Sequence, residues 1–396
     1  MPLPARFHRA ARLGIYLGAR LFVLCYGREF VYNSDRKHST GCEARRDGNE
    51  RGRPSPVALN PLVESLKRMR QKGERRRRLI VAALLLMAAS VVAGAAQEGW
   101  QATRRGEAGK DLNAVFFADQ KRGWVAGDNG FVSRTEDGGV NWSQQPIETN
   151  EAINDIYFRG KDEGYVLVGS RIFGTRNGGE RWQELRRFSA ADFGGGEPEL
   201  YSLRFSGKKK GWIVGSVSRR DVVVDSLLIY TDDGGASWIR QRVPSKVELI
   251  HVDFTNDQRG WAVGSSGTIL HTENGGQTWT QQRSGTNATL YHVDFRNERV
   301  GWAVGERGTI LRTTDGGESW FPVSVPVRST LLSVQFVDDE QGWIVGRGGT
   351  ILRSDDGGKT WVSQESRTKQ NLYALFFDKK NGWAVGGDGT VLQYVR

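Results

Sequence analysis

Cysteine is almost missing from this chain of 396 residues. The sequence has 2 cysteines, Cys25 and Cys42, and both precede an apolar run at residues 79–96. The chain beyond that run therefore uses neither disulfides nor thiol chemistry. Because no cysteine follows the run, a lipoprotein anchor attached at that site is excluded as well.

A helical pattern and an excess of charge are both missing from the C-terminal three quarters of the chain. Residues 1–97 carry 19 Lys and Arg against 7 Asp and Glu, a net charge of +12, whereas the remaining 299 residues carry 37 against 38. The basic character of the whole chain thus belongs to its N-terminal part. The rest gives no reason to expect a nucleic acid partner.

The basic N-terminal part ends in a pattern typical of exported proteins. From Met69 the sequence runs through a basic segment and an apolar core to small residues such as Ala93 and Ala95. This pattern predicts a signal peptide over 69–97, with an uncleaved membrane anchor as the alternative. Residues 1–68 show no repeat, and we interpret them as unstructured, either an overextended start or an organelle transit peptide. We expect export to the periplasm or extracellular space, or to the thylakoid lumen of a photosynthetic cell.

The C-terminal part repeats one phrase at intervals of 40 to 49 residues. In each copy an aromatic residue follows a glycine: Trp124, Tyr165, Trp212, Trp261, Trp302, Trp343 and Trp383. Each unit contains four short runs in which apolar and polar residues alternate, separated by Gly and Asp turns, which is typical of a four-stranded blade. The sequence therefore predicts an all-β, seven-bladed β-propeller over residues 98–396.

The seventh unit stops after three strands, and the missing strand is found at the other end of the repeat region. Gly99 to Ala102 match the start of a fourth strand and precede the first unit. We therefore expect the N-terminal strand to complete the last blade and close a monomeric ring, which removes open sheet edges. All 13 Trp lie in second strands or at the head of fourth strands, so we interpret them as packing residues.

Six turns follow the Asp-box pattern S/T-x-D-x-G-x-x-W. The acceptor positions are Asp137, Asn177, Asp233, Asn274, Asp315 and Asp356. Asn in two of the six copies keeps a carbonyl acceptor but cannot serve as an acid or a nucleophile. Six equivalent turns around a ring also cannot converge on one substrate. We therefore interpret these residues as structural groups that fix the turns, and we expect no catalytic residues among them.

Two connections look longer than the others and lie at the same end of the predicted ring, residues 186–200 and 216–226. Long loops on a compact scaffold often carry function. These two bring together Arg186, Arg187, Arg219 and Arg220, with Arg171 from the loop of the second blade nearby. We predict that they bind an acidic protein surface, because guanidinium groups pair well with carboxylates. The alternative is a solvated rim of mixed charge, since acidic residues share both loops.

Two innermost strands carry a His-x-Asp pair, His251 with Asp253 and His292 with Asp294. These residue types can bind metals. Equivalent faces of neighbouring blades are not expected to face each other, however, so we expect hydrogen bonds between blades, with no metal and no cofactor.

Asp-boxes also occur in sialidases and other glycoside hydrolases, so a secreted hydrolase is the alternative function. Such enzymes use two placed carboxylates, or a Tyr nucleophile with a carboxylate partner. The F-R-x-P element of sialidases is absent, because Phe158-Arg159 and Phe295-Arg296 are followed by other residues. No unrepeated trio of Glu, Asp and Tyr stands out either. We therefore expect no enzyme activity.

The combined phrase of VDF or VQF, GWAVG, GTILRT and an Asp-box resembles the photosystem II stability and assembly factor family of seven-bladed propellers. The resemblance covers residues 99–396. It implies a non-enzymatic factor that holds newly made reaction-centre subunits through a basic surface patch. Related repeat proteins also occur in bacteria without photosynthesis, so another membrane complex is the alternative partner.

Overall fold

The computed structural model describes residues 99–378 and 381–395. The predicted signal or anchor at 69–97, and the segment 1–68, lie outside the described residues. Within the part of the chain that is described, no helix is long and apolar enough to cross a membrane.

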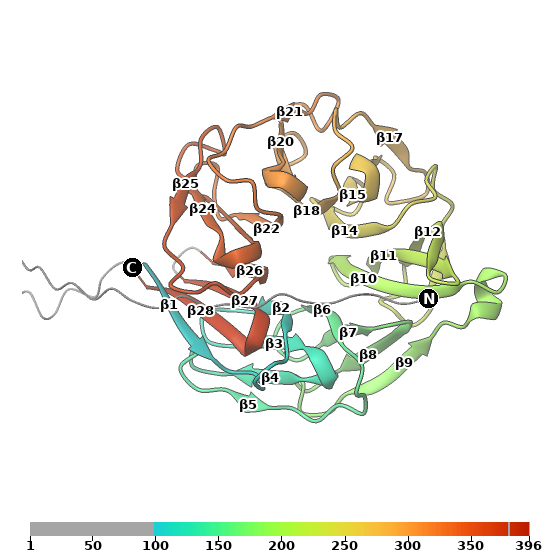
Figure 1. Ribbon diagram of the computed structural model, residues 1–396. Coiled ribbons are helices and arrows are strands. Elements are labelled where there is room, and N and C mark those ends of the chain that lie inside the picture. The colour runs from blue at the N-terminus through green and yellow to red at the C-terminus, as the bar shows by residue number, and fades with distance from the viewer. Residues whose placement is uncertain (1–98, 379–380, 396) are drawn as a thin grey trace, which may run out of the picture. The chain divides into compact units, whose positions relative to one another are not determined.

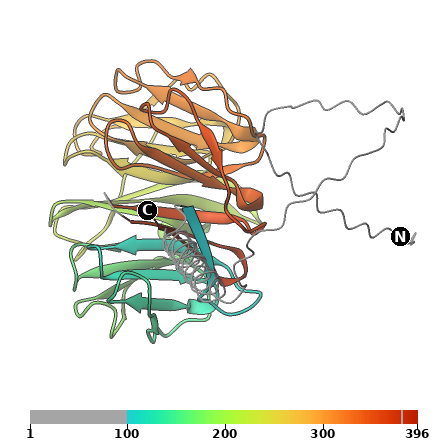
Figure 2. The same cartoon turned by 90° about the vertical axis from the view of Figure 1, so that its left-hand side faces the viewer.

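The described residues form seven four-stranded antiparallel sheets that follow one another around a ring (Figure 1). This confirms the predicted seven-bladed β-propeller. Seen from the side, the strands run across the thickness of the ring (Figure 2). The Asp-box turns and the connections between first and second strands lie at one end, here called the Asp-box end. The turns between second and third strands and the links between blades lie at the other, the connection end.

Each blade is built from the channel outward by four strands in sequence order, except the last. The first strands are β2 (Leu112–Phe117), β6 (Ile153–Phe158), β10 (Glu197–Ser206), β14 (Leu249–Phe254), β18 (Leu290–Phe295), β22 (Leu331–Phe336) and β26 (Leu372–Phe377). The second strands are β3 (Gly123–Gly127), β7 (Gly164–Val168), β11 (Lys210–Arg219), β15 (Gly260–Gly264), β19 (Gly301–Gly305), β23 (Gly342–Gly346) and β27 (Gly382–Gly386). The third strands are β4 (Val132–Thr135), β8 (Arg171–Thr175), β12 (Val222–Thr231), β16 (Ile269–Thr272), β20 (Ile310–Thr313), β24 (Ile351–Ser354) and β28 (Thr390–Val395). The fourth strands are β5 (Ser143–Gln144), β9 (Gln183–Arg187), β13 (Ile239–Arg240), β17 (Thr280–Gln282), β21 (Phe321–Pro322), β25 (Val362–Gln364) and β1 (Gly99–Arg104).

Short 3₁₀ turns account for the helical residues in the described ranges. They are η1 (Asp128–Gly130), η2 (Ala190–Phe193), η3 (Ser265–Gly267), η4 (Glu306–Gly308), η5 (Arg347–Gly349) and η6 (Gly387–Gly389). All except η2 join a second strand to a third. Blades two and three make the same connection with a tight hairpin instead.

The N-terminal strand closes the ring as predicted. β1 pairs with β28 in an antiparallel register that runs from Gly99 opposite Val395 to Arg104 opposite Thr390. Trp100 of β1 is 2% exposed and contacts Phe377 edge-on, with ring centroids 5.5 Å apart. The last blade therefore has the same outer strand and the same aromatic packing as its neighbours.

A repeated aromatic stack joins most neighbouring blades. Trp302 of β19 is fully buried and stacks on Phe336 of the next blade at 3.5 Å between centroids, and Trp361 meets the same phenyl ring edge-on at 5.6 Å. Gly342 permits the close approach, since a Cβ there would lie 2.5 Å from the Phe336 ring. The second-strand Trp therefore serves as packing between blades, where a large buried apolar area stabilises each junction.

Candidate protein-binding site

Arg171, the first of the five predicted binding arginines, is buried rather than presented to a partner. It is 8% exposed, and its Nη2 donates to Thr149 Oγ1 and Glu151 Oε1, both at 2.7 Å. Its Nη1 lies 3.6 Å from Glu184 Oε2. These contacts tie the link between blades one and two to β8, so the guanidinium is already neutralised and hydrogen-bonded.

The other four arginines are exposed on the outer part of blades two and three. Arg187 forms an ion pair with Glu184 at 2.8 Å. The Arg186 guanidinium lies over the Phe188 ring at 5.1 Å, and Arg219 Nη2 donates to the Gly194 carbonyl at 2.6 Å. Arg220 occupies the turn between β11 and β12. The structure thus places Arg171 beside Arg186 and Arg187, and it links Arg219 to the neighbouring connection.

The predicted loop over 216–226 is wrong, because these residues form the tip of a β-hairpin. β11 and β12 each have ten residues and are joined by two residues alone, Arg220 and Asp221, at φ of 51° and 63°. Two successive residues with positive φ form the tight turn that matches strand twist. The long connection over 186–200 is also shorter than predicted, since β9 extends to Arg187, β10 begins at Glu197 and η2 lies between them.

The six Asp-boxes share one hydrogen-bond pattern. In the first box, Asp137 Oδ1 accepts from Thr135 Oγ1 at 2.9 Å and from the Asn141 amide at 2.8 Å. In the second, Asn177 Oδ1 accepts the equivalent bonds from Thr175 and the Arg181 amide. Equivalent bonds recur at Asp233, Asn274, Asp315 and Asp356. The bond from the hydroxyl and the bond from the amide need only an acceptor, which Asn and Asp both supply.

These bonds also favour the ionised carboxylate where an Asp is present. The Ser237 hydroxyl and amide, followed by the Thr231 hydroxyl, lower the pKa of Asp233 to about 2. A group with so low a pKa is a poor general acid at neutral pH.

The His and Asp pairs of blades four and five lie along the central channel, and the expectation that equivalent faces do not meet is wrong. The rings of His251 and His292 stack with centroids 3.6 Å apart. Inner strands converge on the ring axis, so side chains at matching positions come into contact there. His251 Nε2 lies 2.9 Å from Arg204 Nη2, and Arg204 Nη1 lies 3.3 Å from Asp155 Oδ2.

Hydrogen bonds between blades are present in this cluster. The amide of Phe295 donates to Asp253 Oδ2 at 2.8 Å, and that of Phe336 donates to Asp294 Oδ2 at 2.9 Å. Burial lowers the pKa of His292 to about 3, and burial together with the charge of Asp253 raises the pKa of Asp294 to about 8. The cluster thus keeps its imidazoles neutral and one carboxyl protonated near neutral pH.

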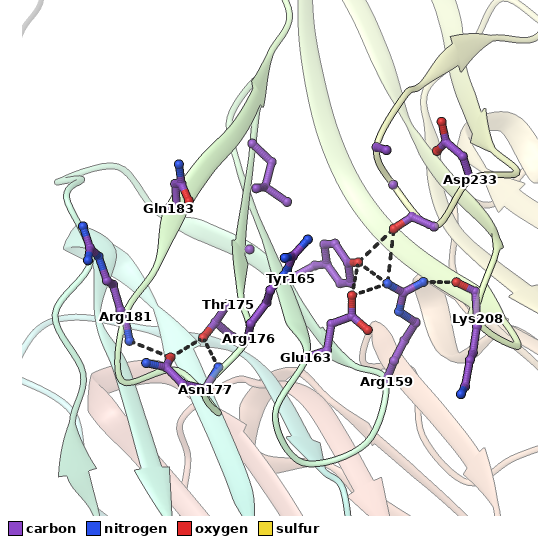
Figure 3. A pocket seen from close by; sticks show the side chains of 15 residues that line it. Arg159, Glu163, Tyr165, Thr175, Arg176, Asn177, Arg181, Gln183, Lys208 and Asp233 are labelled. Carbon is purple, nitrogen blue, oxygen red and sulfur yellow. Dashed lines mark hydrogen bonds and ion pairs between the residues drawn. The ribbon is translucent and has the colours of Figure 1, made fainter.

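A groove of about 610 Å³ lies at the Asp-box end between blades two and three (Figure 3). The junction differs from the others because Tyr165 replaces the second-strand Trp and Gly174 replaces a larger side chain of the third strand. The Tyr165 hydroxyl donates to the Gly234 carbonyl at 3.0 Å, as the Trp212 indole does to Gly275. Burial raises the pKa of Tyr165 to about 12, so this donor stays protonated.

Elsewhere the position of Gly174 is filled. Arg312 donates through Nε to the Gly357 carbonyl of the next Asp-box at 2.9 Å, and Gln393 donates through Nε2 to the Gly138 carbonyl at 3.1 Å. Gly174 lacks such a side chain, and Leu185 of β9 covers it while remaining 47% exposed. The groove is therefore the space that a side chain occupies at other junctions.

The second Asp-box also differs in charge. Arg176 stands where four other boxes carry the acids Glu136, Asp232, Glu273 and Asp355, and Arg181 stands where the others carry Asn, Ser or Thr. Both line the groove. Within the described part of the chain, neither guanidinium has an acidic or carbonyl partner. Our sequence analysis missed this site, although comparison of the seven units position by position would have shown four departures at one junction.

Comparisons with known proteins agree on the family. The profile described as photosynthesis system II assembly factor YCF48 matches six overlapping segments between residues 93 and 395. The chain is 28% identical over 149 residues to the photosystem II assembly lipoprotein Ycf48 of Picosynechococcus sp., which covers 36% of this chain and 40% of that protein. It is 30% identical over 135 residues to the chloroplastic photosystem II stability/assembly factor HCF136 of Oryza sativa subsp. japonica, over 31% of this chain and 29% of that protein. The chain thus spans less than half the length of these curated relatives.

Solved structures show the same fold. A structure of YCF48 bound to a D1 peptide superposes with a TM-score of 0.62 at 21% identity, over 75% of this chain and 97% of that chain. YCF48 from Cyanidioschyzon merolae superposes with a TM-score of 0.60 at 22% identity, over 75% of this chain and 98% of that chain. A virginiamycin B lyase from Staphylococcus aureus superposes with a TM-score of 0.62 at 14% identity, over 76% of this chain and 100% of that chain. The propeller fold alone therefore does not separate assembly factors from enzymes. The family profile matches segments across the whole propeller, and the chain belongs to the photosynthesis system II assembly factor YCF48 family.

Proposed function

We propose that this protein is a non-enzymatic assembly factor that binds a protein subunit of a membrane complex, a photosystem II reaction-centre subunit where the cell has one. The observation that carries the proposal is the family match over all seven blades. Its relatives are named as photosystem II assembly factors, and one related structure contains a D1 peptide. In this proposal the protein is exported and acts as a monomer. Its contact with the membrane is through the signal segment where that segment is not cleaved.

The alternative, a glycoside hydrolase, has less support from the geometry. Among the described residues that line the channel pocket around His251 and His292, Arg204 is the one arginine, and it is bonded to Asp155 and His251. A sialidase would need several arginines for the substrate carboxylate. The Asp-box carboxylates are spread around the ring and are used by their own turns, so they offer no pair across a glycosidic bond.

At the connection end, the exposed arginines Arg186, Arg219 and Arg220 remain the proposed contact for an acidic partner surface. Arg187 lies beside them, paired with Glu184. Arg171 supports this surface from below, since it is buried and holds Glu151 and Thr149. A substitution at Arg171 would therefore disturb the fold as well as any binding. It should be left out of a binding test.

The test is affinity capture from mildly solubilised photosynthetic membranes with the full chain as bait. We expect the parent to retain a reaction-centre subunit, and the triple variant Arg186→Gln, Arg219→Gln, Arg220→Gln to retain several-fold less. A double variant, Arg283→Gln with Arg328→Gln, removes exposed cations elsewhere and should retain the parental amount. If the parent retains no reaction-centre subunit at low salt, the proposed function is wrong. If the triple variant retains as much as the parent, the function stands and the binding surface is elsewhere.

A further inference from the structure

The junction between blades two and three departs from the repeat in four residues that line one groove. Tyr165 replaces Trp, Gly174 replaces a larger residue, Arg176 replaces an acid and Arg181 replaces a small polar residue. A repeat that is kept at the other junctions for packing can change at one place without loss of the ring. Four changes in one lining point to a ligand, because random drift would scatter them among seven junctions.

The groove has an apolar floor and a cationic rim. Leu185 lies over Gly174, with its side chain 47% exposed. Arg176 extends toward Tyr165, and Arg181 lies on the other side of the Asp-box turn at Asn177 (Figure 3). Both guanidinium groups lack acidic partners in the described residues. A ligand that fits must therefore combine a negative charge with an aliphatic stem.

The remaining charges in the groove do not cancel this preference. Arg159 is the deepest cation, and it is already paired with Glu163 at 2.5 Å and hydrogen-bonded to the carbonyls of Lys208 and Gly234. Asp233 is committed to its own turn, where it accepts from Thr231 and Ser237. Arg176 and Arg181, together with Lys208 of the same lining, have no acidic partner among the described residues, which favours a carboxylate over a cation.

The strand beside the groove indicates the form of the ligand. β9 is the outermost strand of its sheet and has five exposed residues, whereas β5, β13 and β21 have two each. An outermost strand presents unpaired backbone N–H and C=O groups that an extended peptide can pair with. Gln183 and Leu185 of β9 line the groove. Alternate residues of a peptide that pairs with β9 would face the same side.

We propose that this groove binds an acidic side chain of an extended segment of the protein partner. The segment lies along β9, its carboxylate sits between Arg176 and Arg181, and its aliphatic stem rests on Leu185. This site is at the Asp-box end, opposite the arginines of the connection end. It deepens the proposed function by naming the chemistry of the partner and rests on that function.

The test uses the full chain and an array of short, end-blocked peptides, each made with Glu or Asp and again with Gln or Asn at the same places. We expect the acidic peptides to bind the parent about tenfold more tightly than their neutral twins. Gly174→Gln copies Gln393, fills the groove without adding charge, and should abolish the difference. Arg176→Gln with Arg181→Gln should abolish it too, whereas Arg283→Gln with Arg328→Gln should preserve it.

Three results would overturn the proposal. One is equal binding of acidic and neutral peptides by the parent. Another is that Gly174→Gln and the Arg176/Arg181 double variant both keep the parent's preference for acidic over neutral peptides. The third is binding of inorganic phosphate or free glutamate as tightly as the acidic peptides, which would indicate a small-anion site without a peptide. Thermal melting of each variant separates loss of binding from loss of fold. Membrane capture by the parent reports on the proposed function independently, so failure of the groove and failure of the function give different results.

Discussion

The junction between blades five and six and the junction between blades two and three solve the same packing problem differently. In the first, Trp302 stacks on Phe336 at 3.5 Å, Arg312 reaches the next Asp-box, and the interface is filled. In the second, Tyr165 and Phe205 are tilted by 31° with centroids 5.0 Å apart, and Gly174 leaves a groove. Residues that recur at most junctions hold the blades together. We expect binding at the one junction where these residues differ.

The strongest test of this contrast is to remove the shared aromatic. Trp302→Ala should lower the free energy of unfolding by about 3–5 kcal/mol, since it leaves a large cavity in a fully buried junction. Denaturant unfolding followed by circular dichroism would measure it. Phe321→Ala, at a side chain that is 62% exposed, should change stability little. A similar loss for both variants would contradict the assignment of Trp302 to packing.

The Asp-boxes allow a smaller and sharper test. Asp315→Ala should cost about 1–2 kcal/mol, because Ser319 and Thr313 lose the acceptor to which they donate. Asp315→Asn reproduces the acceptor of the second box, Asn177, and should cost well under 1 kcal/mol. The comparison is made by thermal melting of the two variants. Equal losses would mean that the charge, rather than the acceptor, holds the turn.

The inner strands offer a pH-dependent test at the same two junctions. Asp294 has a folded pKa of about 8, raised by burial and by Asp253, above an unfolded value of 3.8. The native state therefore binds one more proton than the unfolded state between these values, and its stability falls as pH rises toward 8. We expect the parent to lose about 1.5 kcal/mol between pH 6.5 and 8.

Asp294→Asn keeps the acceptor for the Phe336 amide but does not titrate. This variant should lose clearly less stability than the parent over that range, although Asp155 and Asp253, whose pKa values burial also raises, still titrate. At the junction between blades two and three, burial also raises the pKa of Asp155, but the charge of Arg204 opposes this shift. Asp155→Asn should therefore remove less of the loss of stability at high pH than Asp294→Asn does. Urea unfolding at several pH values would measure both. A decline in Asp294→Asn as large as that of the parent would place the main titrating group elsewhere.

The smallest expected effect comes from converting the irregular junction into a regular one. Gly174→Arg copies Arg312 and should stabilise the ring by about 0.5–1 kcal/mol, since Gly in a strand carries an entropic cost. A Cβ at this position meets the flexible Leu185 side chain at 2.5 Å, which can move outward. Differential scanning calorimetry would detect the rise in Tm. A fall in Tm would show that Leu185 packs on Gly174 for stability.

The repeated features could be predicted from the sequence because the physics that fixes them is local and recurs. The glycine before Trp302, the Thr and Asp of each box and the alternation within strands each follow from one turn or one strand face. The closing strand at Gly99 was also predictable, since the last unit lacks its fourth strand. Each of these predictions rests on comparing copies rather than on any single residue.

The features that could not be predicted depend on pairing across space. The segment around Arg219 and Arg220 has polar residues and no Gly or Asn at its turn, so the strands of the hairpin were not apparent. The burial of Arg171 depends on Glu151 in the link between blades one and two, and the stacking of His251 on His292 depends on how inner strands converge. The groove was visible in principle, because Gly174 and Arg176 depart from their counterparts.

The pairing of β1 with β28 has a consequence for how the ring is made. Gly99 and Val395 are partners in the last blade, so the strand synthesised first must wait for the strand synthesised last. Until then β1 has no partner and the aromatic pocket around Phe377 lacks Trp100. The long sequence separation makes this contact slow to form. While the propeller folds, two strand edges therefore stay unpaired at once, and they favour aggregation until β1 and β28 pair.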